Sequence, residues 1–425
     1  MKIPALVPLL LVVAAPALGG APPPDVVRLG FNYPRTGPYF AEGLDQLRAA
    51  QMAVDEVNQA GGILGKKVEL VIRDSQSKAD VTKKNVTELI DQEKVKMVFG
   101  GSASNVAVAA GEVCQEKGVV FFGTLTYSNA TTGSDGHRHT FRECYSAWMG
   151  AKVLGKYLRE NFKGKKYFYV TADYTWGWTT EESMRVFTDT TDTAVHGSTR
   201  TPFPTAVASD IKRALDLAEA AKPDVLVLVL FGQDMVNAIN MAAGRGLKDR
   251  VQIVVPNLTL AMAEAAGPKN MAGVLGAVPW SWKVPYKYGY QRGIKFVEAF
   301  AARYHRYPST SGASAYTIVY EFKDAVERAK SFESPDVIRA LENHTYQLLK
   351  DPQTWRDFDH QSVQTVYAVR CNAPEVVARD RFKLDFYDII DVMSGAEAAK
   401  TKKEWVKERT DAKKPPFLEK LPGEK

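Results

Sequence analysis

The feature that most constrains the fold of this chain is an alternation of short apolar segments with longer segments of helical periodicity. Val26–Asn32 is apolar, and Glu42–Ala60 repeats its apolar residues every three or four positions before it ends at Gly61-Gly62. Three more strand-like segments, separated by two helical ones, follow before residue 123. Strands joined by single helices pair in parallel, because such a crossover returns the chain to the same end of the sheet. This part of the chain therefore predicts a doubly wound parallel sheet.

The same rhythm restarts further along the chain. Helical periodicity over Ala147–Glu160 and Thr180–Phe187 alternates with the apolar segments Tyr167–Thr171 and Val225–Leu230, and another strand is expected over Gln252–Val255. These segments predict a second α/β sheet, and 425 residues are enough for two domains with separate cores. The fold class that we predict is α/β, with two doubly wound lobes.

The N-terminus has the composition of a secretory signal. Lys2 is followed by an almost wholly apolar stretch from Pro4 to Leu18 and by small residues up to Ala21. An apolar core this short and this early is typical of a cleaved signal peptide, which we assign to residues 1–21. The cleavage region contains no Cys, so no lipid anchor is expected. The sequence therefore predicts a soluble protein that is exported by a cleavable signal.

The net charge of +6 is concentrated near the C-terminus. Residues 400–425 carry nine Lys or Arg against five Asp or Glu, which is +4. The remainder is close to neutral and lacks the basic stripe that binding to nucleic acid needs, so this class of function is excluded. Because residues 396–425 are charged and interrupted by prolines, we expect a mobile tail or a surface helix there.

The three cysteines, Cys114, Cys144 and Cys371, are widely separated in the sequence. An exported protein can form one disulfide and leave the third thiol buried, and three buried apolar side chains fit the spacing equally well. No CxxC pair occurs, so a redox or zinc site has no support.

Motifs for catalysis and cofactor binding do not occur in the sequence. Gly61-Gly62 follows its helix instead of preceding it, and no Gly-Lys-Ser/Thr comes after, so no helix N-terminus is placed to hold a phosphate. Neither an HExxH metal motif nor a nucleophile elbow is present. We therefore expect a protein that is not an enzyme and that holds no metal and no cofactor.

A series of loop motifs occurs in an informative order. The first is Thr36-Gly37-Pro38-Tyr39, which leads through the first helix to Gly61-Gly62-Ile63-Leu64-Gly65. The others are Phe99-Gly100-Gly101-Ser102-Ala103-Ser104, the segment 118–133, Phe141-Arg142, Asp173-Tyr174-Thr175-Trp176-Gly177, Lys222-Pro223-Asp224-Val225 and the segment 307–316. Over roughly residues 25 to 390, this order resembles the type I periplasmic binding proteins of the leucine/isoleucine/valine-binding class.

The resemblance implies two lobes joined by crossover strands, each lobe discontinuous in sequence. Residues 25–144 and 280–345 would form lobe 1, and residues 145–279 and 346–390 would form lobe 2. In such proteins a hinge closes the lobes around a small molecule, which is delivered to the permease and ATPase of an ABC importer. We therefore expect a monomeric, periplasmic solute-binding protein for a small polar or hydrophobic/aromatic organic molecule. A sensing module that presents its closed form to a chemoreceptor or sensor kinase is the alternative.

The resemblance also places the ligand between specific loops. Ser102, Ala103 and Ser104 precede an Ala-rich helix, where hydroxyl and free N–H groups either cap the helix or bind an acceptor oxygen of a ligand. The resemblance favours ligand binding, with Ser104 as the anchor. The other residues expected to bind the ligand are Leu125, Thr126, Tyr127, Tyr174, Trp176, Phe231, Asn257 and Glu42.

Asn257 departs from the amino-acid receptors of this family, which generally place an acid at this position to hold the ligand's ammonium. A buried ammonium without a countercharge is costly. Either Glu42, Asp173 or Asp234 supplies the charge, or the ligand has no ammonium. Of these alternatives, we favour a small non-amino-acid or amide-like ligand, or an aromatic carboxylate.

Overall fold

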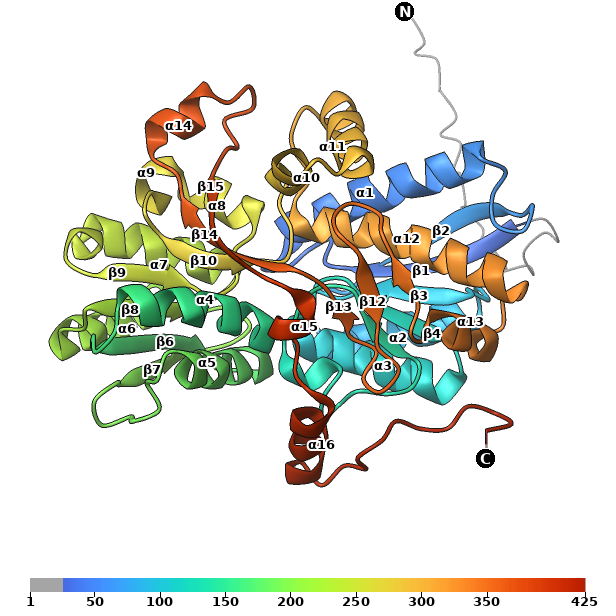
Figure 1. Cartoon of the computed structure of the whole chain (residues 1–425), viewed down its shortest axis with the longest axis horizontal. Coiled ribbons are helices and arrows are strands. Elements are labelled where there is room, and N and C mark those ends of the chain that lie inside the picture. The colour runs from blue at the N-terminus through green and yellow to red at the C-terminus, as the bar shows by residue number, and fades with distance from the viewer. Residues whose placement is uncertain (1–25, 425) are drawn as a thin grey trace, which may run out of the picture.

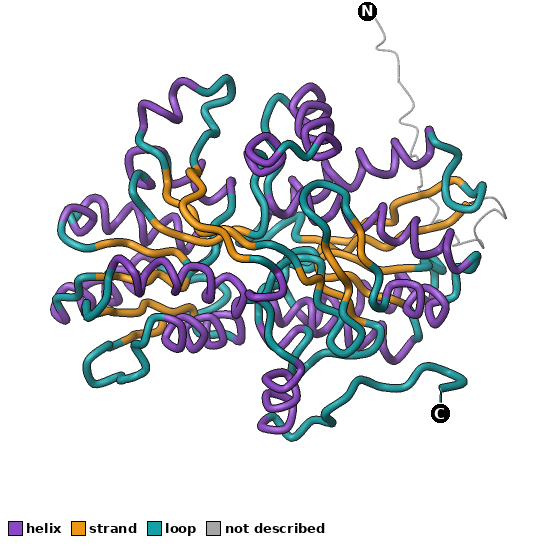
Figure 2. Tube along the Cα trace, in the orientation of Figure 1, coloured by secondary structure: helices purple, strands orange, loops and turns teal. Residues whose placement is uncertain are grey.

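The computed structural model describes residues 26–424, which form two α/β lobes side by side (Figure 1). Figure 2 shows the strands of each lobe enclosed by helices. The signal peptide that we expect over residues 1–21 lies outside the described residues. Across the described part of the chain, no helix combines the length and the apolar character needed to cross a membrane.

Lobe 1 is built on a parallel five-stranded sheet in the order β2-β1-β3-β4-β5. Its strands are β1 (Val26–Tyr33), β2 (Lys67–Asp74), β3 (Met97–Gly100), β4 (Val120–Gly123) and β5 (Thr140–Arg142). Its first helices are α1 (Phe40–Gln59), α2 (Ala79–Asp91), α3 (Ser104–Lys117) and the short η1 (Asn129–Thr131). The strands and helices expected before residue 123 are confirmed to within about two residues at each end, and β5 extends the sheet.

Helices cover both faces of this sheet, as its apolar strands require. On one face, α2 and α3 pack together over a core that contains Val98 and Phe121. On the other face, Phe99 and Phe122 belong to a core shared with α1. Consecutive residues of β3 and β4 thus serve opposite cores, because strand side chains alternate between faces. The remaining helices that pack on lobe 1 are α11 (Gln291–Tyr304), α12 (Thr310–Ala329) and α13 (Ser334–Leu341).

Lobe 2 contains a seven-stranded sheet in the order β15-β14-β10-β9-β8-β6-β7. Its strands are β6 (Tyr167–Ala172), β7 (Ser198–Thr201), β8 (Val225–Val229), β9 (Gln252–Val255), β10 (Leu275–Val278), β14 (Val366–Cys371) and β15 (Tyr387–Met393). Its helices are α4 (Ala147–Asn161), α5 (Thr175–Phe187), α6 (Ala208–Ala221), α7 (Gln233–Gly244), η2 (Leu247–Asp249), α8 (Leu260–Ala266), α9 (Pro268–Met271) and α14 (Pro374–Arg379). β14 and β15 are antiparallel additions to a parallel sheet. The predicted doubly wound α/β class is confirmed.

The start of α5 differs from the sequence-based expectation. The apolar periodicity places its first residue at Thr180, whereas the structure begins the helix at Thr175, so that Trp176 and Gly177 lie in its first turn instead of a loop. A Cβ atom on Gly177 would lie 1.9 Å from the carbonyl oxygen of Ala172, at the end of β6. The glycine therefore marks a helix packed closely on a strand end, and not a turn.

The chain passes between the lobes three times: from β5 to α4, from β10 to α10 (Lys283–Tyr288), and into β14. The buried Lys350 links two of these crossings, since its ammonium donates to the carbonyl oxygens of Pro279 (2.7 Å) and Thr365 (2.7 Å) and to Oε1 of Gln364 (2.8 Å). The amide of Gln364 in turn donates to the carbonyl oxygen of Glu143 in the first crossing. One buried network therefore connects all three crossings.

A small antiparallel sheet lies beside the third crossing. Its strands are β11 (Thr345–Tyr346), β12 (Gln353–Trp355) and β13 (Ser362–Val363). Trp355 is fully buried and packs with Phe122 and Phe141 of lobe 1, at centroid distances of 6.1 and 5.5 Å. The sequence predicts that residues 346–390 belong to lobe 2, but the structure places 346–363 against lobe 1 and only β14 and β15 in the sheet of lobe 2.

Residues 394–424 form a C-terminal strap that starts on lobe 2 and ends on lobe 1 (Figures 1 and 2). α15 (Gly395–Ala398) packs on α4, and α16 (Lys402–Asp411) then brings Trp405 and Arg409 to the loop that follows η1. Trp405 is 2% exposed, and its Nε1 donates to the carbonyl oxygen of Thr132 at 2.8 Å. Arg409 is equally buried and donates to two main-chain carbonyls of the same loop. Of the two alternatives, a mobile tail or a surface helix, the structure supports the helix, and this helix is anchored to lobe 1 by Trp405 and Arg409.

All three cysteines are free and buried. Burial raises the pKa of each thiol, that of Cys144 to about 12, so none is reactive at neutral pH. Of the two interpretations of the cysteine spacing, the structure supports three buried apolar side chains.

Replacement of Trp405 by Ala should destabilise the protein by about 3–5 kcal/mol, because it removes a large buried ring and leaves a cavity under the strap. Trp178→Ala is the matched control, because Trp178 is 44% exposed and its loss should cost far less. Urea unfolding of both variants would measure the difference. Equal unfolding midpoints for the two variants would contradict the anchoring role of Trp405.

Candidate functional site

The carboxyl ends of strands from both sheets meet at the boundary between the lobes. From lobe 1, the segments that follow β1 and β4 bring Tyr39 and Tyr127 to this boundary. From lobe 2, the segments that follow β8 and β9 bring Phe231 and Asn257. Ligands of open α/β sheets bind outside the carboxyl ends of the strands. The boundary is therefore the candidate site.

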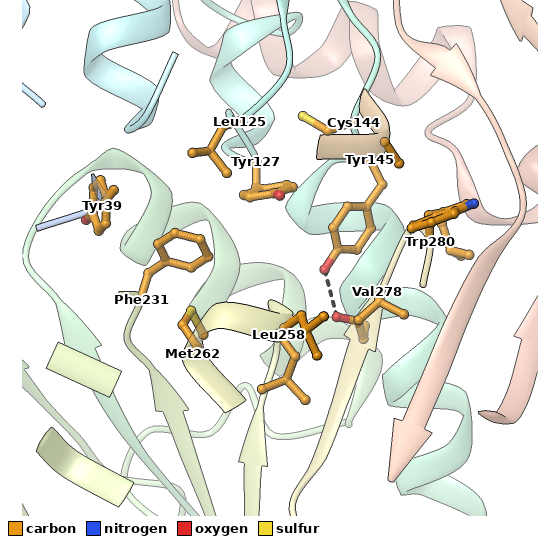
Figure 3. Packing of buried hydrophobic residues seen from close by; sticks show 14 of the residues in the cluster. Tyr39, Leu125, Tyr127, Cys144, Tyr145, Phe231, Leu258, Met262, Val278 and Trp280 are labelled. Atoms are coloured by element: carbon orange, nitrogen blue, oxygen red, sulfur yellow. Dashed lines mark hydrogen bonds between the residues drawn. The ribbon is translucent and has the colours of Figure 1, made fainter. Parts of the chain in front are cut away.

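Five rings form an interlobe aromatic cluster, namely Tyr39, Tyr127, Tyr145, Trp176 and Phe231. Phe231 is its centre, with ring centroids of Tyr39, Trp176 and Tyr127 at 5.2, 5.9 and 6.0 Å. Tyr145, from the first crossing, packs edge-on to Tyr127 at 5.4 Å. In Figure 3, Leu125 and Tyr127 of lobe 1 face Phe231, Leu258 and Met262 of lobe 2. The site surface is thus mainly aromatic and aliphatic, with contributions from both lobes.

Gly232 marks the closest approach of the lobes. It follows Phe231 with φ of 59°, and a Cβ atom there would lie 2.7 Å from the ring of Tyr39 and 2.8 Å from the carbonyl oxygen of Pro38. Only glycine fits both the backbone angle and the contact. The lobes are therefore shut in this structure.

Polar contacts also join the lobes. Ser128 Oγ lies 3.2 Å from Thr179 Oγ1 of α5, and the amide of Asn129 donates to Ser183 Oγ at 3.0 Å. Nearer the cluster, Thr259 Oγ1 donates to Oε1 of Glu42 at 2.9 Å. Each such bond exists only while the lobes are closed, so it contributes to the closed state alone.

Several buried donors near the cluster have no hydrogen-bond partner among the described residues. They include the hydroxyl of Tyr127, Trp176 Nε1, Asn257 Nδ2, Trp280 Nε1 and Ser281 Oγ. An unpaired buried polar group costs about 1–3 kcal/mol. Such groups are therefore natural positions for a ligand's acceptor atoms or for ordered water.

Two small cavities lie beside Trp280. One is lined by Leu258 and Thr259 of lobe 2 together with Thr310 of lobe 1, and the other reaches from Trp280 to Lys350 at the crossings. Each has a volume of about 10 Å³, which is room for roughly one water molecule. An organic ligand therefore needs the lobes to separate, or side chains to move, before it can enter either cavity.

The serines and threonine expected at the site make bonds inside lobe 1. Ser104 Oγ accepts from the backbone N–H of Ser128 at 3.1 Å, and Ser102 Oγ lies 3.5 Å from Ser75 Oγ. Thr126 Oγ1 is bonded to a neighbouring threonine hydroxyl, while Ala103 and Leu125 are simply buried. These bonds hold the segments that follow β3 and β4 in place.

The structure brings the expected aromatic residues together. Tyr127, Trp176 and Phe231 belong to the interlobe aromatic cluster, and Tyr174 stands beside it, stacked on Phe203 at 3.9 Å with its hydroxyl 3.4 Å from that of Tyr39. Asn257 is 2% exposed, and its Oδ1 accepts from the hydroxyl of Tyr145 at 2.6 Å.

The three acids considered as countercharges lie in different surroundings. Asp173 is half-exposed and bonds to Trp178 and Arg200, away from the cluster. Asp234 is buried, and burial raises its pKa to about 6, but its carboxylate accepts from Ala206 N within lobe 2. Only Glu42 bonds across the lobe boundary. Its burial raises the pKa to about 7.

Sequence reasoning missed three aromatic residues of this region, Tyr39, Tyr145 and Trp280. Tyr39 stands inside the motif after β1, so its position there was a usable signal. Tyr145 and Trp280 lie in two of the crossings, where no periodicity identifies which side chains point to the site.

Curated relatives match part of the chain. A Leu/Ile/Val-binding protein of Rhizobium johnstonii is 32% identical over 140 residues, which are 33% of this chain and 38% of that protein. The chain thus spans about two fifths of the length of the first relatives that it matches.

Solved structures match most of the chain. A periplasmic binding protein from Burkholderia mallei has a TM-score of 0.80 and 25% identity, and the match covers 89% of this chain and 98% of that one. A branched-chain amino acid transporter substrate binding protein from Streptococcus pneumoniae, in complex with isoleucine, has a TM-score of 0.72, 21% identity and coverages of 86% and 99%. A solute binding protein from R. palustris, in complex with benzoate, has a TM-score of 0.72, 19% identity and coverages of 88% and 97%.

The family model described as periplasmic binding protein matches residues 26–375. This range contains both sheets up to β14, the three crossings and every residue of the interlobe aromatic cluster, and it ends before the C-terminal strap. The motif order, the two-lobed architecture and this match agree. The chain therefore belongs to the type I periplasmic binding proteins.

Proposed function

We propose that this protein is an extracytoplasmic solute-binding protein, not an enzyme, that captures a small organic molecule between its lobes and presents the closed form to the permease and ATPase of an ABC importer. The observation that carries the proposal is the meeting of two half-sites from separate sheets. Rings from both lobes pack around Phe231, and buried donors without partners lie beside them. The names of the relatives and the family support the importer role.

The two half-sites explain how binding is coupled to closure. Trp176 and Asn257 belong to lobe 2 and Tyr39 and Tyr127 to lobe 1, so the complete set of contacts exists only when the hinge is shut. A ligand that touches both lobes stabilises the closed form by its extra contacts there. Closure also removes water, which strengthens each hydrogen bond to the ligand. An importer that recognises the closed surface would then distinguish loaded from empty receptor.

The lining of the site indicates a ligand with an apolar or aromatic body. Aromatic side chains bury large areas and favour stacking or edge contacts with a ligand ring. The unpaired donors Trp176 Nε1 and Asn257 Nδ2 favour at least one acceptor atom on the ligand. Neighbours of this fold hold isoleucine in one structure and benzoate in another, so the scaffold accommodates both aliphatic and aromatic bodies.

A thermal-shift panel of amino acids, amides, amines, aromatic acids, short alcohols and urea tests the receptor role. A ligand present at a hundredfold excess over its dissociation constant should stabilise the protein by about 2.7 kcal/mol, because it binds the folded state alone. Uptake of the identified compound should fall in a strain that lacks the protein. A panel without any stabilising compound would contradict the receptor role, and a lost sensory response with normal uptake would favour the sensing alternative.

Replacement of Trp176 by Phe tests the site itself. The variant keeps a ring against Phe231 but loses Nε1, so the affinity for a ligand of the panel should fall by about two- to tenfold, the value of one hydrogen bond. Trp178→Phe is the control and should leave the affinity unchanged, because Trp178 lies in the same helix but is 44% exposed. Titration calorimetry measures both. Equal affinities for the two variants and the wild type would remove Trp176 from the site.

A further inference from the structure

Glu42 is an acid in unusual surroundings. It lies in the first turn of α1, is 2% exposed, and accepts a hydrogen bond from the hydroxyl of Thr259 in the opposite lobe. An acid in the first turn of a helix is ordinarily solvated, where it only balances the helix dipole. Here the same position is covered by lobe 2, so helix capping alone does not explain a carboxyl group at this depth.

No cation of the described residues offsets this carboxyl group. Among residues 26–424, Glu42 forms no ion pair with Lys, Arg or His. The nearest acid on its helix, Asp45, has Arg48 at 3.3 Å and Arg306 at 3.7 Å, and its other oxygen accepts from Ser309 N. Arg48 and Arg306 therefore form ion pairs with Asp45 and not with Glu42. Burial, and to a smaller degree Asp45, raises the pKa of Glu42 to about 7.

Glu42 lies within electrostatic range of three tyrosine hydroxyls. The hydroxyls of Tyr39, Tyr127 and Tyr387 lie near enough that its charge adds to the effect of burial in raising their pKa values. Ring faces attract cations, and a buried carboxylate gains most from a partner of opposite charge. Because Tyr39 and Tyr127 belong to the interlobe aromatic cluster and are also within electrostatic range of Glu42, a ligand cation at Glu42 would lie near the cluster.

We propose that Glu42 selects ligands that carry a protonated amine, with the amine against Glu42 and an apolar or aromatic body against the interlobe aromatic cluster. The inference rests on the receptor role proposed above and names the ligand class of that same site. A carboxylate at this position would face Glu42 without a cation between them, which is repulsive in a low-dielectric site. Asn257, on lobe 2, then pairs with Tyr145 and does not hold charge.

Three probes of nearly equal shape separate the possibilities: 2-phenylethylamine, 2-phenylethanol and phenylacetate. The wild type should bind the amine most tightly. Glu42→Gln keeps the size of the side chain and removes its charge, so it should weaken binding of the amine by at least tenfold and change binding of the alcohol by less than threefold. Titration calorimetry at fixed ionic strength measures each affinity.

The pH dependence gives a second readout. The amine stays protonated between pH 6 and pH 8, whereas Glu42 changes from mostly protonated to mostly ionised over that range. For a ligand-free receptor that rests in the closed form of this structure, where the pKa of Glu42 is about 7, the wild-type affinity for the amine should therefore be about tenfold higher at pH 8 than at pH 6. The other titratable groups facing this region are Asp45 on α1, Asp234 on lobe 2 and the hydroxyls of Tyr39, Tyr127 and Tyr387. In the Glu42→Gln variant the pH dependence should disappear.

Two further variants separate Glu42 from the other acids. Asp173→Asn is the matched control, because this half-exposed acid pairs with Arg200 and should leave all affinities unchanged. Asp234→Asn tests the other buried acid. Loss of the amine preference in Asp234→Asn but not in Glu42→Gln would overturn the inference, and so would tightest wild-type binding of phenylacetate.

Failure of this inference is distinguishable from failure of the receptor role. If compounds of the thermal-shift panel bind but none of the three probes does, or if Glu42→Gln weakens the amine and the alcohol alike, the inference is wrong and the receptor role stands. If no compound of the panel binds the wild type, the receptor role itself fails and the inference fails with it.

Discussion

The relation between the two lobes depends on one buried ammonium group. Lys350 is 2% exposed, and burial lowers its pKa to about 8. An ammonium has three donors, and all three are used, on Pro279, Gln364 and Thr365. Because these acceptors belong to two crossings, and the side chain of Gln364 donates to the third, this one group ties all three crossings together. The desolvation of Lys350 is offset only while the three acceptors keep their places.

A hinge held in this way favours rotation of rigid lobes over local unfolding. One hydrophobic cluster runs through both lobes, and where it crosses their boundary it consists largely of aromatic rings, joined there by a few hydroxyl groups. The separate cores expected for the two lobes are therefore continuous in this closed form. Burial of the rings stabilises the shut form, while unpaired donors such as Trp176 Nε1 and Asn257 Nδ2 destabilise it. A ligand that accepts hydrogen bonds from these donors removes their unfavourable contribution, while the burial of the rings continues to stabilise the shut form. The C-terminal strap, which lies outside the range of the family match, connects the lobes further. It packs on α4 of lobe 2 and is bonded to the loop after η1 in lobe 1.

The sequence predicted local features well because their signals are local. Apolar strands and periodic helices of lobe 1 are read from neighbouring residues, and Tyr127, Trp176 and Phe231 follow strands whose ends must meet at one edge. The start of α5 was predicted wrongly because its first turn contains Gly177, whose contact with Ala172 is tertiary.

Long-range contacts explain the other differences. The packing of Trp355 on Phe122 and Phe141 joins residues more than two hundred positions apart, which no periodicity reveals. The strap has the charge of a solvated tail, and its only sequence signal is the pair Trp405 and Arg409, which share one helix face at a spacing of four. Lys350 resembles any surface lysine until its three acceptors are brought together by the fold.

The position of the site's acid links its protonation to closure. Glu42 belongs to lobe 1, but Thr259, which covers it and donates to it, belongs to lobe 2. In an open form the carboxyl group is exposed to water, so its pKa falls toward the ordinary value, whereas in the closed form it is about 7. At a pH between the open-form and closed-form pKa values of Glu42, an empty receptor that closes must therefore take up a proton or bury an unpaired charge. Closure around a cation requires neither. Glu42 lies on lobe 1 and Thr259, which covers it, lies on lobe 2. Closure without a cationic ligand is therefore least favourable above pH 7, where Glu42 is ionised in both the open and the closed form.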